Sequence, residues 1–477
     1  MNLTNDEVKS TFNYRNQLNS IGSYNQNSRL ADELITIPVK IHVVSDSSGN
    51  INKMNLLTLF GQICDLNELY NQVGFYFYLL PEINYIKDNR FIRTGGAKFE
   101  DAERERMFGN MMYSHYYYGA LNVYYTLGTG ICGMAPFPFM SQRYEGRTGV
   151  LMESNFQCSG PGSKTLAHEI GHHFDLLHPH QGWDSKDSRY SEYVTRTEGI
   201  RNCKTAGDGF CDTPADVQDF SCPYIGDHKD LRGDFYNPDV SLIMSYHKDI
   251  CQNKFSDQQI AHMNSVIRLD TGRIVYLQNQ IAYFSQIKNA TLISPAESSI
   301  IQVEKNTTFE WENVEDAEAY LINISTGAGS VIEQAMVFGV NSYNYNFKFA
   351  DRGRSFYWTV YPIKFSQPCL KSFTPRKFTL TSSITSLFNN TSFSFSIYPN
   401  PLIGERNVTI QMQGEWANKK SVALKLISLN GQVVQELIVP SMSNQLNLKI
   451  DDNISSGVYF LHFHTDEGNY QSKLIIQ

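Results

Sequence analysis

The first part of the chain alternates between short apolar runs and segments with apolar side chains at helical spacing. Residues 36–44 (TIPVKIHVV) form an apolar run between polar loops, which predicts a strand. Residues 55–73 carry apolar side chains at helical spacing, which predicts a helix. Further strands are predicted at residues 75–80, 121–127 and 150–153, and further helices at residues 100–112 and 164–174. This alternation predicts an α/β (α+β) domain over residues 35–285.

Beyond that domain the pattern changes to short alternating strands separated by turn residues. Trp311 and Trp358 lie in strand-like contexts, and the spacing predicts a β-sandwich over residues 290–380 that resembles a fibronectin III-like module. Small polar residues predict a linker at 381–394. Residues 395–477 again predict an all-β sandwich domain.

Length and composition limit the classes of protein that need to be considered. A chain of 477 residues predicts two to four domains, and 41% hydrophobic with 18% charged residues indicates globular protein. The net charge of −8 gives no support to nucleic-acid binding, and no apolar run is long enough for a membrane span. Residues 1–34 are polar and lack the layout of a secretory signal, so we interpret them as an N-terminal arm or pro-segment remnant.

Half of the eight cysteines are clustered: Cys203, Cys211, Cys222 and Cys251. No CxxC pair occurs, which argues against a structural zinc ribbon and favours disulfides. Disulfides indicate an oxidising compartment, and four cysteines allow three pairings. Elsewhere Cys132 and Cys158 are candidates for a pair, whereas Cys64 and Cys369 are expected to be free thiols or too far apart to pair.

A candidate metal site lies in the predicted helix over residues 164–174. His168 and His172 are four residues apart, so both imidazoles face the same side of a helix and can bind one metal ion. Glu169 lies beside them, where it can act as general base toward a zinc-activated water. His178, beyond the end of the helix, is the expected third ligand, since three protein ligands and a water complete a catalytic zinc site.

The histidine spacing resembles the metzincin motif HExxHxxGxxH, except that Asp175 stands at the position of the turn glycine. Aspartate is among the few residues that tolerate the left-handed backbone expected there. The stretch IMSYH resembles the methionine turn of these enzymes. The resemblance places Met244 beneath the metal, and Tyr246 is expected to stabilise the developing oxyanion.

Further motifs resemble the pappalysin and cytophagalysin group of metzincin-type peptidases. These are GDGFCDTPA at residues 207–215, the segment from Met244 to Met263, the strand at residues 121–124, and residues 133–137. The resemblance implies a zinc endopeptidase with one catalytic Zn²⁺ that hydrolyses protein or peptide substrates. It also implies two disulfides in the cysteine cluster, for which we expect Cys203–Cys222 and Cys211–Cys251. Calcium is a second candidate cofactor, with candidate ligands Asp208, Asp212 and Asp216.

The C-terminal domain carries YPNP at residues 398–401, LNGQVV at 429–434, GVYFL at 457–461 and the ending KLIIQ. Together these resemble the C-terminal sorting domain of the type IX secretion system of Bacteroidetes. That resemblance implies the secretion machinery as a partner and a secreted or cell-surface location. We therefore expect that a signal peptide is missing from this chain.

Two alternatives to a metzincin-type endopeptidase follow from the same residues. A gluzincin would take its third ligand from a downstream glutamate, and His178 with the methionine turn argues against it. A secreted adhesin or binding protein with an inactive protease-like domain would depend on the β-domains for function. The presence of Glu169 argues against that reading.

Overall fold

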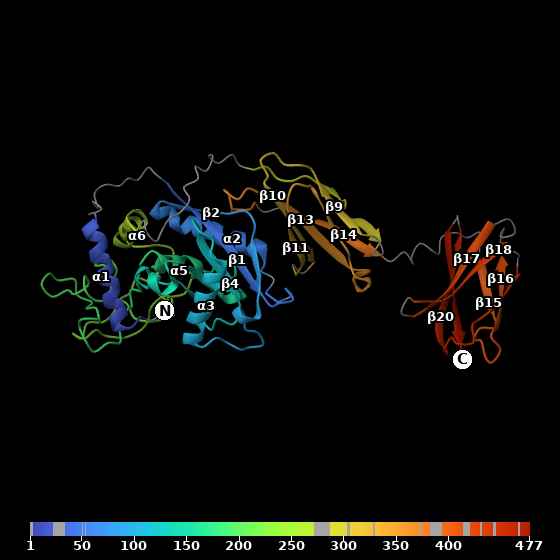
Figure 1. The fold of residues 1–477 in the computed structure, drawn as a ribbon, viewed down its shortest axis with the longest axis horizontal. Helices are drawn as coiled ribbons and strands as arrows, with labels where there is room; N and C mark the ends of the chain where they lie inside the picture. Colours follow the sequence, from blue (N-terminus) through green and yellow to red (C-terminus); the bar gives the residue numbers. More distant parts are fainter. Residues whose placement is uncertain are drawn as a thin grey trace.

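The computed structural model describes residues 3–21, 34–49, 51–52, 54–270, 287–302, 306–327, 330–371, 374–381, 394–413, 420–429, 432–441, 445–465 and 468–477. Its helices are α1 (Asn5–Ile21), α2 (Leu56–Tyr70), α3 (Asp101–His115), α4 (Phe156–Ser159), α5 (Thr165–His173) and α6 (Asp257–Leu269) (Figure 1). Short 3-10 helices are η1 (Asn71–Val73), η2 (Asn89–Phe91), η3 (Pro138–Tyr144) and η4 (Phe349–Asp351).

The N-terminal α/β part is built on a 6-stranded sheet with strand order β2-β1-β4-β6-β5, in which β3 also pairs with β1. The strands are β1 (Ile35–Ser45), β2 (Phe75–Leu79), β3 (Asn84–Lys87), β4 (Leu121–Thr126), β5 (Gly133–Met134) and β6 (Gly149–Glu153). All pairings are parallel except that of the edge strand β5 with β6. The strands and helices predicted for this region are confirmed.

Both faces of this sheet are covered by helices, as expected for parallel strands. Val123 and Tyr125 of β4 point into the core formed with α2 and α5, whereas Tyr124 packs against Phe108 of α3 on the opposite face. Because alternate side chains enter opposite cores, every residue of β4 is buried, including the polar Asn122 and Thr126. The sheet thereby holds α5 in a fixed position beneath its edge strand.

Helix α1 was not predicted, because its buried face is partly polar. Val8, Thr11, Arg15 and Leu18 follow one another at helical spacing and are all buried, but two of the four are polar. The helix contacts α6 and η3, so residues 5–21 are packed onto the α/β part.

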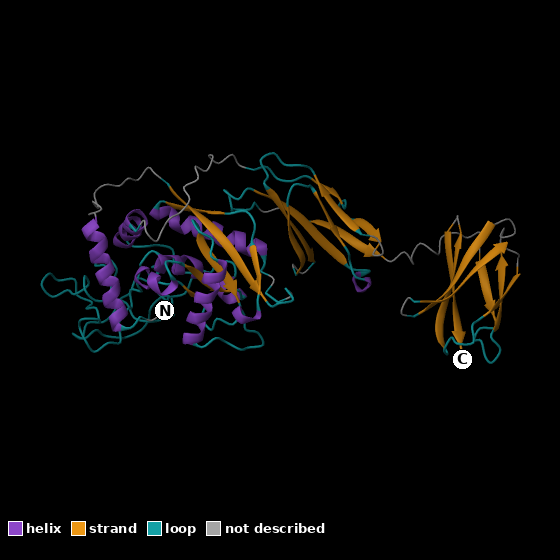
Figure 2. Cartoon of the chain, viewed as in Figure 1, coloured by secondary structure: helices purple, strands orange, loops and turns teal. Residues whose placement is uncertain are grey.

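The described residues from 287 onward form β-strands and loops, as predicted, apart from the short 3-10 helix η4 (Figure 2). A 5-stranded sheet (order β11-β10-β13-β14-β8) faces a 3-stranded sheet (β12-β9-β7), with Trp311 and Trp358 fully buried in their common core. The strands are β7 (Leu292–Ser294), β8 (Ser299–Gln302), β9 (Thr307–Trp311), β10 (Ala319–Thr326), β11 (Val331–Val337), β12 (Ser342–Tyr345), β13 (Ser355–Ile363) and β14 (Arg376–Thr381).

A second pair of sheets, β15-β16-β19 and β18-β17-β20-β21, forms the C-terminal part around an apolar core of its own. Its strands are β15 (Ser394–Tyr398), β16 (Asn407–Gln413), β17 (Lys420–Ser428), β18 (Val433–Ser441), β19 (Gln445–Lys449), β20 (Gly457–Thr465) and β21 (Gly468–Ile476). The predicted linker lies almost wholly outside the described residues, as does the Asn430-Gly431 pair of the LNGQVV motif.

The first β-sandwich is joined directly to the α/β part. A disulfide links Cys64 of α2 to Cys369, so the expectation that these two cysteines are unpaired is wrong. The hydroxyl of Tyr76 donates to the Ser366 carbonyl at 2.9 Å, and Phe365 extends into the core beneath the sheet. The sequence does not reveal this disulfide, because its cysteines are 305 positions apart and only the folded chain brings them together.

The other disulfides agree only partly with expectation. Cys132 and Cys158 are paired, which confirms that candidate. In the cluster, Cys203 pairs with Cys211 and Cys222 with Cys251, so the expected pairings Cys203–Cys222 and Cys211–Cys251 are wrong. Each disulfide closes a separate loop, because the turn at residues 207–209 brings Cys211 back beside Cys203, 8 residues earlier.

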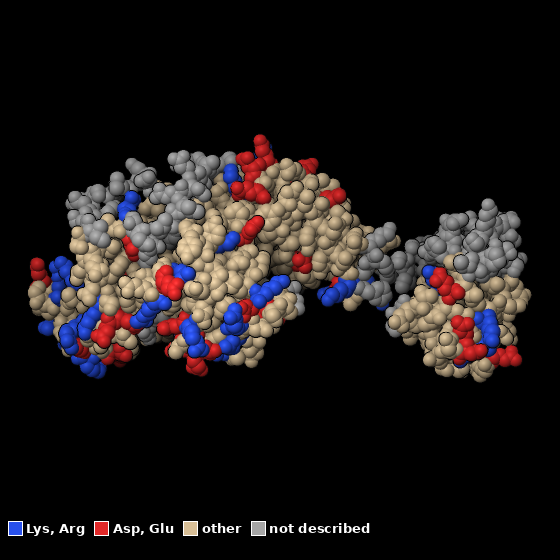
Figure 3. Space-filling model, viewed as in Figure 1, with Lys and Arg blue, Asp and Glu red and all other residues tan. Residues whose placement is uncertain are grey.

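Surface charge is mixed on the face drawn in Figure 3. Lysines and arginines alternate there with aspartates and glutamates along the lower side of the α/β part, instead of gathering in one basic patch. Within the described residues, no helix has both the length and the apolar character needed to cross a bilayer.

Candidate metal centre

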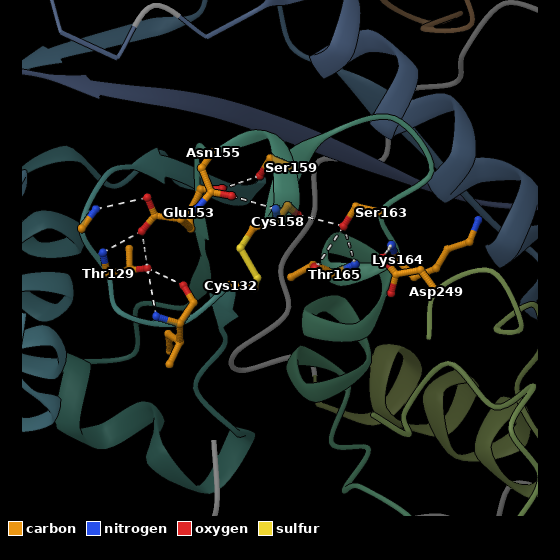
Figure 4. The surroundings of a disulfide bond; sticks show 12 residues. Thr129, Cys132, Glu153, Asn155, Cys158, Ser159, Ser163, Lys164, Thr165 and Asp249 are labelled. Carbon is orange, nitrogen blue, oxygen red and sulfur yellow. Dashed lines mark hydrogen bonds between the residues drawn. A yellow bond between two sulfur atoms is a disulfide. The ribbon is translucent and has the colours of Figure 1, made fainter. Parts of the chain in front are cut away.

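The connection that leads into α5 is braced from several sides (Figure 4). The Cys132–Cys158 disulfide ties α4 to the start of β5, and the Ser163 hydroxyl donates to the Cys158 carbonyl at 2.8 Å. The Lys164 backbone N–H donates to Asp249 Oδ2 at 3.2 Å. These contacts fix the start of α5, and therefore the direction in which His168 points.

Helix α5 ends in a turn that reverses the chain. The Asp175 N–H donates to the His172 carbonyl and the Leu176 N–H to the Gly171 carbonyl, both at 2.9 Å, which is the Schellman arrangement. Asp175 occupies its left-handed position with φ of 67°, confirming that aspartate replaces the turn glycine. The reversal brings His178 back beside the helix.

Three buried imidazoles converge at this point. His178 Nε2 lies 3.0 Å from His168 Nε2 and 2.9 Å from His172 Nε2. The opposite nitrogen of each of the two imidazoles on α5 faces a backbone carbonyl. His168 Nδ1 lies 2.8 Å from the Ile243 carbonyl oxygen, and His172 Nδ1 lies 2.7 Å from the Leu176 carbonyl oxygen. A carbonyl oxygen only accepts hydrogen bonds, so each Nδ1 carries the proton and each Nε2 presents a lone pair.

This arrangement fits a metal cation. Burial lowers the pKa of His168 to about 4 and the pKa values of His172 and His178 well below their usual value, so all three rings are neutral. Neutral imidazole is the form that binds metal. Among the described residues, these three histidines are the group whose potential ligand atoms lie within 4.8 Å of one another.

Glu169 is buried next to the three histidines. Burial raises its pKa to about 7, and its Oε2 atom has no hydrogen-bond partner in the described part of the chain. Gly133 of the edge strand makes room for it, because a Cβ at that position would lie 2.8 Å from Glu169 Oε1. Sequence reasoning noted Gly133 only as part of a motif and missed this close approach.

Met244 and Tyr246, from the predicted methionine turn, lie against α5 and the histidine rings. Met244 is fully buried, and a Cβ on Gly171 of α5 would overlap its Sδ atom. The ring of Tyr246 lies 4.6 Å from the His178 ring and 5.7 Å from the His168 ring. Burial raises the pKa of Tyr246, so its hydroxyl remains protonated and able to donate a hydrogen bond.

The three candidate calcium ligands are near this site, but each is engaged elsewhere. Asp208 Oδ1 accepts from the Phe210 N–H and the Thr213 hydroxyl. Asp212 accepts from Ser256 and Gln258 at the start of α6. Asp216 accepts from the Val217 N–H and the Ser245 hydroxyl. The described residues therefore do not bring the three carboxylates together as one ligand set.

Comparison with known proteins identifies two segments. Residues 115–268 match the family model described as "Pregnancy-associated plasma protein-A", and residues 396–477 match that of the "Secretion system C-terminal sorting domain". An extracellular metalloprotease of Arthroderma gypseum is 29% identical over 249 residues, which cover 50% of this chain and 74% of that protein. Human pappalysin-1 is 27% identical over 153 residues, which cover 31% of this chain and 9% of that protein.

A solved structure of mature mirolysin from Tannerella forsythia, in complex with a cleaved peptide, is also similar. It is 19% identical, with a TM-score of 0.38, and the match covers 52% of this chain and 99% of that one. The family matches favour a peptidase over the alternative of a secreted adhesin. Residues 115–268 therefore form a pappalysin-type metallopeptidase domain and residues 396–477 a secretion-system sorting domain, so the chain is a secreted or cell-surface metalloendopeptidase.

Proposed function

We propose that this protein hydrolyses peptide bonds in extracellular proteins with one zinc ion held by His168, His172 and His178. The observation that carries the proposal is that three neutral imidazole rings converge with their Nε2 atoms facing one another. Backbone carbonyl groups accept hydrogen bonds from the Nδ1 atoms of His168 and His172, which fixes the orientation of these two rings. Cysteine, aspartate and glutamate are absent from this ligand group, and three imidazoles suit zinc.

The roles of the neighbouring side chains follow from their surroundings. A bound zinc ion would acidify water and polarise the carbonyl of the scissile bond. Glu169 accepts the proton of the attacking water through its unpaired Oε2, and then delivers it to the leaving amine. Tyr246 donates its hydroxyl proton in a hydrogen bond to the oxyanion that develops on the substrate. Met244 supports α5 from below and keeps His168 and His172 in place.

The test separates the base from the ligands. Glu169→Gln keeps all three histidines, so the variant should retain zinc while its turnover of a quenched peptide falls by about 10²–10⁴-fold. Glu68→Gln on the exposed side of α2 is the matched control and should leave both unchanged. Near-native turnover by Glu169→Gln would disprove the assigned role, and a wild-type chain that binds no zinc would disprove the metal site.

We further propose calcium binding near Asp208 and Asp216. Asp208 and Asp216 each accept hydrogen bonds, as Asp212 does from α6, but Asp208 Oδ2 has no hydrogen-bond partner in the described part of the chain. Support comes from Glu192, a buried neighbour that sequence reasoning missed. Burial, and then the charge of Asp208, raise the pKa of Glu192 well above its usual value, and burial raises that of Asp208 to about 7. Arg196 already forms an ion pair with Glu192 Oε1 at 2.8 Å, and a bound cation would add to this compensation and stabilise the Asp208 carboxylate. Added calcium should raise the melting temperature of the wild type but not of Glu192→Gln, and an equal rise in both would contradict this site.

A further inference from the structure

The turn between the second and third histidines contains a buried carboxylate in an unfavourable backbone conformation. Asp175 is fully buried and has a positive φ of 67°, which side chains other than glycine rarely adopt. Glycine would suit the backbone and would bring no charge into the core. A charge buried at this position has to be compensated by partners from elsewhere in the fold.

Two side chains, those of Arg15 and His262, form hydrogen bonds with this carboxylate. Arg15 of α1 donates from Nε to Asp175 Oδ2 at 2.8 Å and from Nη2 to the Asp175 carbonyl at 2.6 Å. His262 of α6 places Nε2 2.9 Å from the same Oδ2. The guanidinium also donates from Nη1 to the Asp208 carbonyl at 2.7 Å and lies over the Phe210 ring at 4.8 Å. Arg15 thus contacts both the side chain and the main chain of the turn.

The start of α1, together with Leu3 just before it, also packs beside the end of the turn. Leu3 and Val8 share an apolar cluster with Leu177, the residue before the third histidine, and with Phe137. The Phe137 ring in turn lies 4.9 Å from the ring of His172. The N-terminal segment therefore contacts the turn at Asp175 and at Leu177, on either side of Leu176.

We propose that Arg15 is a positioning residue for the metal centre: by neutralising Asp175, it holds the left-handed turn that presents His178. On this basis α1 is a permanent part of the active peptidase, and is not an inhibitory pro-segment to be removed. Breaking a buried ion pair by removing one partner leaves an uncompensated charge, so loss of α1 would disturb the turn. The inference rests on the proposed zinc site.

A double-mutant cycle tests whether Arg15 acts through Asp175. Arg15→Met should speed zinc release to a chromophoric chelator by about tenfold and lower kcat/KM for a quenched peptide similarly, as for other residues that support metal ligands. Asp175→Gly should stay near wild type, since glycine holds the turn without a charge and the guanidinium of Arg15 keeps its hydrogen bonds to the backbone carbonyls of residues 175 and 208. In that glycine background, Arg15→Met should change zinc release by no more than about twofold. Such rescue is not expected if Arg15 only packs α1 onto the domain.

Helix α1 also supplies the control variant. Lys9→Met removes an exposed ion pair with Asp6 and should change nothing. The proposal would be overturned if Arg15→Met speeded zinc release and lowered kcat/KM equally in the wild-type and Asp175→Gly backgrounds, or changed neither quantity in either background. It would also be overturned if Asp175→Gly alone changed these quantities tenfold. A chain without residues 1–21 should release zinc faster, whereas a pro-segment would yield higher activity when removed. If the wild type holds no zinc, the proposed function fails, and the cycle read in melting temperatures still tests the coupling.

Discussion

Replacing Gly171 with alanine would insert a methyl group between α5 and the methionine turn. The added Cβ would overlap Met244 Sδ and lie 3.0 Å from its Cε, and Met244 is fully buried. Alanine in a helix gains about 1 kcal/mol over glycine, whereas an extra methyl in a packed core costs about 1–3 kcal/mol. The net effect is a loss of about 1 kcal/mol, with Met244 displaced from beneath the histidines.

Gly61 of α2 is the matched control, because a Cβ there would meet no atom within 4 Å. Gly61→Ala should therefore stabilise the protein by about 1 kcal/mol, so the two variants should differ by about 2 kcal/mol. For a domain of this size the difference corresponds to about 4–8 °C in melting temperature, measured by thermal unfolding of the full chain. Gly171→Ala should also release zinc faster. If both variants were stabilised equally, the contact between Met244 and α5 would be refuted.

Two other predictions concern the same turn. Tyr246→Phe should lower kcat by about 10²–10³-fold with little change in KM, because the hydroxyl acts on the developing oxyanion; unchanged kcat in steady-state assays would remove it from the mechanism. Burial opposes the charge on His247, but Asp216, at 3.4 Å, leaves its pKa raised. Its contribution to stability is therefore present below pH of about 6.5 and is lost as pH rises through the raised pKa. In His247→Gln the melting temperature should fall less steeply with rising pH than in the wild type. A pH profile identical to that of the wild type would contradict this contribution.

The metal centre could be predicted from the sequence because its geometry is local. His168 and His172 are fixed by helical periodicity, and His178 follows within a single turn. The left-handed backbone conformation of Asp175 could also be predicted, because aspartate is one of the few residues that can replace glycine in such a turn. Fold class followed from the alternation of apolar patterns, which reports directly on strands and helices.

Long-range contacts could not be predicted in this way. Helix α1 is held by Arg15, whose partner Asp175 lies 160 residues away, and no periodic pattern reports a buried cation. The pairing of Cys203 with Cys211 depends on the path of a loop with little regular structure. Gly133 matters only because Glu169 approaches it in space. Each of these requires the folded chain.

The Cys64–Cys369 disulfide changes what proteolysis does to this molecule. Cys64 belongs to α2, and Cys369 lies beyond β13 in the following sandwich. A single cut anywhere between α6 and β7 would leave the two fragments covalently joined. The nicked enzyme would migrate as one species on a non-reducing gel and as two after reduction. Outside the cell, where proteases are abundant and disulfides persist, the peptidase would keep its sandwich even after the backbone between them had been cleaved.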